Sequence, residues 1–78
     1  MLKIETETYI LGERGFRFKV GNDVAFKYRG SYYVGIIDSI NEADGSFTCF
    51  NMLKDKKSFE NTKFYVKYVE GLNFSYED

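Results

Sequence analysis

Short runs of alternating apolar and polar residues, separated by glycine-containing turns, make up most of this sequence. Successive side chains of a β-strand point to opposite faces, so a period of two is typical of strands with one buried face. No segment has a convincing amphipathic helical repeat. The pattern therefore predicts an all-β fold of five to six short antiparallel strands.

Turn residues separate the expected strands. The Gly-Glu-Arg-Gly segment at 12–15 predicts the turn of an N-terminal hairpin, and residues 21–23, 30–31 and 41–45 predict further turns. The lysine-rich segment 53–61 is expected to be a loop. The runs that we expect to form strands are residues 2–11, 16–20, 24–29, 32–40, 46–52 and 63–69.

The last of these runs is ambiguous, because Phe64, Tyr68 and Leu72 also have helical spacing. Aromatic and β-branched residues lose rotamer freedom in a helix, which favours a strand for residues 63–69. The choice between helix and strand for residues 60–70 stays open at this point.

Gly35 lies in the middle of the longest apolar run. A glycine inside a strand weakens it, so it commonly marks a bend, a bulge or the close approach of another group. Here it fits the corner of a barrel. Strands at spacings of about 8 to 12 residues predict a small closed or nearly closed barrel.

A chain of 78 residues is expected to form one domain. Such a chain buries only about 60% of its unfolded surface and cannot divide that burial between two cores. Within residues 1–78 we expect an N-terminal hairpin at 1–20, a barrel core at 21–70 and a flexible acidic tail at 71–78. The 19% of aromatic residues supply large buried areas for this core.

Cysteine content and the N-terminus predict a soluble, cytoplasmic protein. Cys49 has no partner for an internal disulfide, and the first residues lack the apolar core of a signal peptide. No apolar run approaches the roughly 20 residues that a membrane span needs. Richness in Lys, Asn, Ile, Tyr and Phe is also what an AT-rich genome, such as that of a low-GC bacterium or its phage, encodes.

The charges alternate in blocks along the chain. The formal net charge is −1, so the whole molecule lacks a strong positive field. Residues 14–29 nevertheless carry five cations against one acid, and residues 54–67 carry five lysines against two acids. Two interpretations stay open: the blocks decorate a solvated β surface, or folding brings them onto one face.

The groups that most enzymes need are missing. There is no histidine, which removes the commonest general base and metal ligand. Cys49 lies in an apolar run and is expected to be a buried hydrophobic residue rather than a nucleophile. Asp38, Glu42 and Asp44 are interpreted as a solvated hairpin end rather than a metal site. We therefore expect a non-catalytic protein without a cofactor or metal.

Residues 19–52 resemble the SH3-like small β-barrels, in particular the Tudor domains. The resemblance rests on Val-Gly-Asn-Asp-Val at 20–24, then Tyr28, a Gly-Ser turn, Tyr33, Gly-Ile-Ile at 35–37 and Asp-Gly at 44–45. It implies a Tudor-like barrel, and an aromatic cage for methylated lysine or arginine to which Tyr28 and Tyr33 would contribute. Rings around a cation contribute about 0.5 to 2 kcal/mol. Asn51 and Met52 stand where that family offers a further cage tyrosine, so the implied cage is incomplete.

Alternation also assigns faces to the tyrosines. Tyr28 and Tyr32 share the majority apolar side of their strands and are expected to face inward, whereas Tyr33 is expected to face a partner.

Three functions are compatible with these features. The first is a protein- or peptide-binding adaptor that uses exposed aromatic residues. The second is single-stranded nucleic-acid binding by aromatic stacking and a basic patch. The third is a phage or oligomeric assembly protein that pairs through an edge strand at residues 2–11. The partner-binding candidates are Tyr28, Tyr32, Tyr33, Phe50 and Asn51, and the basic-patch candidates are Lys27, Arg29, Lys54, Lys56 and Lys57.

Overall fold

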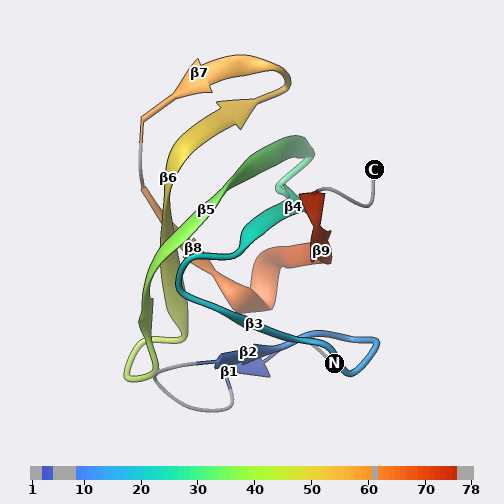
Figure 1. Ribbon diagram of the computed structural model, residues 1–78, viewed down its shortest axis with the longest axis vertical. Coiled ribbons are helices and arrows are strands. Elements are labelled where there is room, and N and C mark those ends of the chain that lie inside the picture. The colour runs from blue at the N-terminus through green and yellow to red at the C-terminus, as the bar shows by residue number, and fades with distance from the viewer. Residues whose placement is uncertain (1–2, 5–8, 61, 76–78) are drawn as a thin grey trace.

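The structure is a computed structural model that describes residues 3–4, 9–60 and 62–75, and within them it is all-β apart from one 3₁₀ turn (Figure 1). A small antiparallel sheet contains β1 (Lys3–Ile4), β2 (Tyr9–Leu11) and β3 (Arg17–Lys19). A larger antiparallel sheet contains β4 (Asp23–Tyr28), β5 (Ser31–Asn41), β6 (Ser46–Lys54), β7 (Lys57–Phe59), β8 (Lys63–Tyr65) and β9 (Val69–Phe74). The all-β prediction is confirmed.

The larger sheet follows the order β7-β6-β5-β4-β9, with β8 paired to β6 beside this path. β6 pairs with two strands besides β5, because residues 46–48 pair with β8 and residues 52–54 pair with β7. The 3₁₀ turn η1 (Val66–Tyr68) then leads from β8 to β9, which pairs with β4. Since no ladder joins β9 to β7 or β8 in the part of the chain described, the sheet is not closed, contrary to the closed-barrel prediction.

The core lies on one face of the larger sheet, which we call the inner face. The β2–β3 hairpin lies across one end of this sheet and contributes Ile10 and Phe18 to the core (Figure 1). The ring of Phe18 packs against Phe74 on β9, with 4.7 Å between the ring centroids. The largest fully buried side chains of the core are Phe18, Phe26, Phe47, Phe64, Ile10, Ile37 and Val24.

The turn at Gly21-Asn22 joins the hairpin to the larger sheet. The Asn22 side-chain oxygen accepts a hydrogen bond from the Lys19 N–H at 2.8 Å. On the other side, the Gly21 N–H donates to the Ile37 carbonyl and the Ile37 N–H donates to the Asn22 carbonyl, at 2.9 and 3.0 Å. The turn that the sequence predicts here is thus confirmed, and its backbone pairing holds the hairpin against β5.

The faces of Tyr32 and Tyr33 are the reverse of the sequence-based prediction. Tyr33 is buried, with 6% of its surface exposed, and Tyr32 is 37% exposed. Both sides of β5 carry apolar residues, so alternation alone cannot select the inner side. Register decides it, because Tyr33 lies directly opposite Phe26 and their rings stack at 5.6 Å between centroids. Tyr28, also predicted to face inward, does pack against the core.

The predicted strand at residues 2–11 is wrong as a single element. β1 and β2 pair with each other in antiparallel register, with Ile4 opposite Ile10, so the chain reverses between them. Residues 5–8 lie outside the described residues. The expected apolar side of this run includes Thr6 and Thr8, so it has little apolar surface to bury. Its alternation therefore predicted a continuous strand poorly. The ten-residue edge strand that the assembly hypothesis needs is therefore not formed.

Three later segments also differ from expectation. The predicted loop at 53–61 contains the end of β6, a two-residue turn at Asp55-Lys56 and the strand β7. The predicted strand at 63–69 divides into β8, η1 and the start of β9. The predicted tail at 71–78 begins too early, because residues 71–74 complete β9 through pairing with β4 and packing of Phe74. The end of β6 pairs with β5 and β9 pairs with β4, partners that are distant in the sequence, whereas β7 pairs with the adjacent β6.

The close approach that a strand glycine commonly marks is present at Gly35, opposite a bulge of β6, but the barrel corner that we expected there is not formed because the sheet is open. The β5–β6 register shifts between Val34 and Ile36. A Cβ atom at Gly35 would lie 2.9 Å from Met52 Cγ and 3.1 Å from Cys49 Cβ, closer than ordinary van der Waals contact. The missing side chain therefore lets β6 pack its inner-face residues against the β5 backbone.

We expect Gly35→Ala to lower the free energy of unfolding by about 1 to 3 kcal/mol, because the new methyl group overpacks this contact. Urea denaturation followed by circular dichroism measures the change. Met52→Ala removes the Cγ atom that the methyl group meets, so Gly35→Ala should cost less in that background. Equal costs in both backgrounds would contradict the steric explanation.

Candidate binding surfaces

Apolar side chains gather on the outer face of β5 and β6, opposite the core. Val34 lies across from Leu53, and Ile36 lies across from Phe50. Tyr32 is two residues before Val34 and so shares its face. Phe50 and Leu53 are each 41% exposed. We call these five residues, Tyr32, Val34, Ile36, Phe50 and Leu53, the outer patch.

A bulge in β6 puts both of its members into the outer patch. Residues three apart in a regular strand point to opposite faces, but Phe50 and Leu53 both face outward while Cys49 and Met52 are both buried. The register shift leaves one extra residue on β6 between Phe50 and Leu53, and Asn51 there has φ of 53°. Asn51, a predicted contact residue, is exposed and also sets the directions of Phe50 and Leu53.

Tyr28 and Tyr33, the predicted cage residues, make contacts within the chain. The Tyr28 hydroxyl accepts a hydrogen bond from the Tyr65 N–H at 3.1 Å, and its ring meets Phe64 edge-on. Lys54 Nζ lies 5.8 Å from the ring centroid of Tyr33 and 5.7 Å from that of Phe59. The chain's own lysine therefore takes the place where a partner's cation would meet Tyr33.

Lys27, Arg29, Lys54, Lys56 and Lys57, the predicted basic patch, gather at one end of the larger sheet, here called the basic end. The β4–β5 turn at Arg29-Gly30 and the β6–β7 turn at Asp55-Lys56 lie at this end (Figure 1). Both are two-residue turns with positive φ throughout, the geometry that suits the twist of a hairpin.

Asp55 links the two halves of the basic end. Its N–H donates to the Tyr32 carbonyl at 2.7 Å, and its side-chain oxygen accepts from the Tyr32 N–H at 3.0 Å. Lys27 is the register partner of Tyr32 on β4. Parts of the two basic blocks are thus brought to the same end of the sheet as Tyr32, which also belongs to the outer patch. The other cations of the blocks lie elsewhere: Arg17 and Lys19 are on β3, and Lys63 contacts Asp44 at the β5–β6 turn.

Arg29 stacks on an exposed aromatic residue next to this end. Its guanidinium carbon lies 4.6 Å from the ring centroid of Tyr68 on η1, and Lys67 Nζ lies 5.1 Å from the same ring. Tyr68 is 42% exposed. The stacking holds an arginine and a tyrosine at the edge of the basic end, a combination that suits recognition of anions or bases.

A carboxylate at the β5–β6 turn is held by hydrogen bonds. Asp44 accepts from the Ser46 hydroxyl and from Lys63 Nζ, the latter at 2.9 Å. The Ser46 hydrogen bond, followed by that from Lys63, lowers the pKa of Asp44 below its usual 3.8. The same contact raises the pKa of Lys63 above its usual 10.5. Asp44 therefore fastens β8 to this turn.

Cys49, the one cysteine of the sequence, is buried in the core. Burial, together with the charge of Asp38, raises the pKa of the Cys49 thiol to about 12, so the thiol stays protonated near neutral pH. The described residues hold no cluster of three or more His, Cys, Asp or Glu side chains able to bind a metal. Among them, too, no helix has the length and apolarity to cross a membrane.

Sequence reasoning missed three members of the outer patch. Val34 and Ile36 were assigned to the core side of their strand, and Leu53 was assigned to a loop. The available signal was the continuous apolar run from Tyr32 to Ile37, which has apolar side chains on both faces. Such a run is typical of a strand with two apolar faces, so it does not show which face is exposed to solvent.

Comparison of the chain with protein-family models, curated proteins and solved structures finds no match. Inference about function therefore rests on the surfaces themselves.

We expect Asp44→Asn to lower the melting temperature at pH 7, because it removes the charge that Lys63 contacts. The folded-state pKa of Asp44 is depressed, so its contribution is present above pH 3.8 and is lost as the pH falls through the folded-state value. The raised pKa of Lys63 means that the contribution also disappears as the pH rises above 10.5.

Melting curves of the wild type and Asp44→Asn from pH 2 to 11 test this, with Glu42→Gln as the control in the same turn. The difference between wild type and Asp44→Asn should shrink at both extremes. A difference that is the same at all pH values would mean that charge is not its cause.

Proposed function

We propose that the protein is a non-catalytic binding module that holds a protein partner on its outer patch. The observation that carries this proposal is that Phe50 and Leu53 are both exposed on the outer face. They lie directly across from Ile36 and Val34. The solvent face of an antiparallel sheet is normally polar, so a cluster of large apolar side chains there marks an interaction site. Aromatic residues such as Tyr32 and Phe50 are typical anchors of protein interfaces.

The surroundings of the outer patch indicate what kind of partner fits. The basic end adjoins the outer patch at Tyr32. Lys27 is the register partner of Tyr32 on β4, and Lys56 lies in the β6–β7 turn. Charged rims steer association and select partners of opposite charge. We therefore propose a partner surface with an apolar centre and acidic residues on one side.

We also propose a Tudor-like, SH3-like arrangement for residues 19–52. In support, a turn at Gly21-Asn22 leads into β4, and Gly35 lies within β5 beside a register shift. A methyl-cation cage does not follow from it, because Tyr28 and Tyr33 are engaged by neighbouring side chains. The proposed contact surface is instead on the opposite face of the sheet.

Phe50→Ser and Leu53→Ser should each weaken partner binding at least tenfold and change the free energy of unfolding by about 1 kcal/mol or less. Val20→Ser is the matched control, because Val20 is also an exposed apolar residue, 51% accessible, but lies outside the outer patch. A photoreactive amino acid at position 53, and at position 20 for comparison, identifies the partner by cross-linking. Calorimetry with the purified partner then gives the affinities.

Equal weakening by Val20→Ser would contradict the proposal, as would equal cross-linking from both positions. Cross-linking from position 53 only to a second copy of the chain would replace the proposed partner with self-association.

Single-stranded nucleic acid is a second candidate partner, and the cations that two separate stretches of the sequence contribute to the basic end favour it. Exposed tyrosines beside lysine and arginine form the usual stacking and phosphate-tracking surface for unpaired bases. Tyr32 and Tyr68 flank the Arg29-Gly30 turn and would act as the stacking rings.

If this candidate is correct, a fluorescent oligothymidine should bind at low salt, with affinity falling steeply as salt rises. Lys56→Gln with Lys57→Gln should reduce the slope of log affinity against log salt by about one to two. Phe50→Ser should leave it unchanged. No binding at low salt, or a slope unaffected by the two lysines, would eliminate this candidate.

A further inference from the structure

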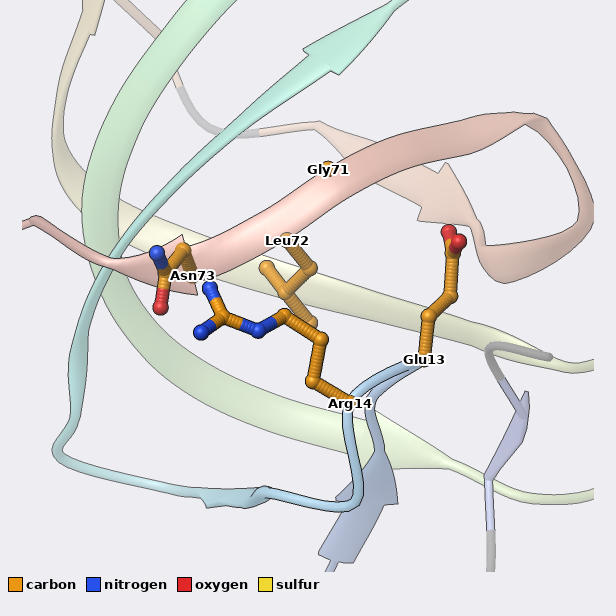
Figure 2. A pocket seen from close by; sticks show the side chains of 5 residues that line it. All are labelled: Glu13, Arg14, Gly71, Leu72 and Asn73. Carbon is orange, nitrogen blue, oxygen red and sulfur yellow. The ribbon is translucent and has the colours of Figure 1, made fainter.

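A small recess separates the β2–β3 turn from β9. Its walls are Glu13 and Arg14 of the turn and Gly71, Leu72 and Asn73 of the strand (Figure 2). Its volume is about 150 Å³, the size of a cavity that holds one benzene molecule. Sites for drug-sized ligands are two or more times larger. The recess therefore suits a single residue rather than a whole cofactor.

The two ends of the recess have opposite charge. Figure 2 shows the guanidinium group of Arg14 extending toward Asn73, the carboxylate of Glu13 at the other end, and Leu72 between them. The described residues offer Arg14 no ion pair, and its guanidinium carbon lies 5.7 Å from the ring centroid of Phe16. The Asn73 side-chain oxygen accepts from the Phe74 N–H, which leaves the amide NH₂ group as a donor.

β9 also has a free edge along this recess. Its ladder is with β4 alone among the described strands, so no strand ladder covers the opposite edge at the recess residues Gly71 to Asn73. Gly71 has φ of 64° and lies where the β4–β9 register shifts. An extended peptide can pair with such an edge through its main chain, with side-chain sites giving the specificity.

We propose that this recess binds the C-terminal residue of an extended peptide. The terminal carboxylate accepts charge-assisted hydrogen bonds from Arg14 and the Asn73 amide, since guanidinium matches carboxylate geometry. The main chain of the peptide runs along the free edge of β9, and Leu72 contacts its last side chain. A basic residue before the last one lies toward Glu13. This site is separate from the outer patch, so it stands or falls independently of the proposed function.

The test uses the full chain labelled with ¹⁵N and two pools of N-acetylated hexapeptides that differ only at the C-terminus. One pool has free carboxylates and the other is amidated, and each is divided into peptides with lysine or glutamine before the last residue. Titrations followed through the amide signals of Gly71, Leu72 and Asn73 give the location and the affinity.

We expect the free-acid pool to shift these signals and amidation to weaken binding at least tenfold. Arg14→Gln should weaken free-acid binding by a similar factor and have little effect on amidated peptides, because both changes remove the same contact. Lys19→Gln is the control, since Lys19 is an exposed cation of the same hairpin. Glu13→Gln should weaken only the peptides with lysine before the last residue.

Equal binding of the acid and amide pools would overturn the proposal, and so would Arg14→Gln binding as tightly as Lys19→Gln. The proposal would also be overturned if Phe50→Ser abolished binding and the peptide did not shift the signals of Gly71 to Asn73. The peptide would then occupy the outer patch.

Discussion

The stacking of Phe26 on Tyr33 across β4 and β5 is the contact on which the rest of this structure depends. Phe64 meets both rings at 5.0 Å between centroids, so β8 is drawn onto the same cluster. Aromatic pairs in such tilted and edge-on arrangements contribute about 0.5 to 1.5 kcal/mol beyond the area that they bury. A small chain without a disulfide gains much of its stability in this way. The cluster also determines which side of β5 faces solvent.

Irregularities in the ladders then decide what the outer face carries. Without the extra residue at Asn51, Phe50 and Leu53 could not both point outward while Cys49 and Met52 point inward. Gly35 is the matching feature on β5, because a side chain there would meet Met52 and Cys49. The bulge and the glycine therefore act together: they close the core on one side and assemble the outer patch on the other.

Charge is distributed unevenly over the surface. Cations gather at the basic end beside the outer patch, whereas the recess beside β9 has one charge of each sign. Arg29 makes a cation–π contact with the ring of Tyr68, and Lys54 makes one with the ring of Tyr33. Asp44 and Lys63 neutralise each other at the β5–β6 turn. A net charge of −1 thus hides an uneven distribution of charge over the surface.

The sequence by itself determined the all-β class, the turn at Gly21-Asn22, the close approach of a neighbouring strand at Gly35 and the burial of Cys49. Each of these follows from local chemistry: the two-residue period, turn-forming residues and a missing side chain. Only the tertiary structure decided that Tyr33 is buried and Tyr32 exposed, because alternation gives relative faces and the pairing with Phe26 selects between them.

The tertiary structure also decided that the chain reverses between β1 and β2, that residues 71–74 complete β9, and that the sheet stays open. It alone brought the β2–β3 turn beside β9 and Lys27 beside the β6–β7 turn. Apart from the pairing of the neighbouring strands β1 and β2, these outcomes depend on contacts between segments far apart in the chain. Their registers are set by packing across the whole core, and no local pattern encodes them.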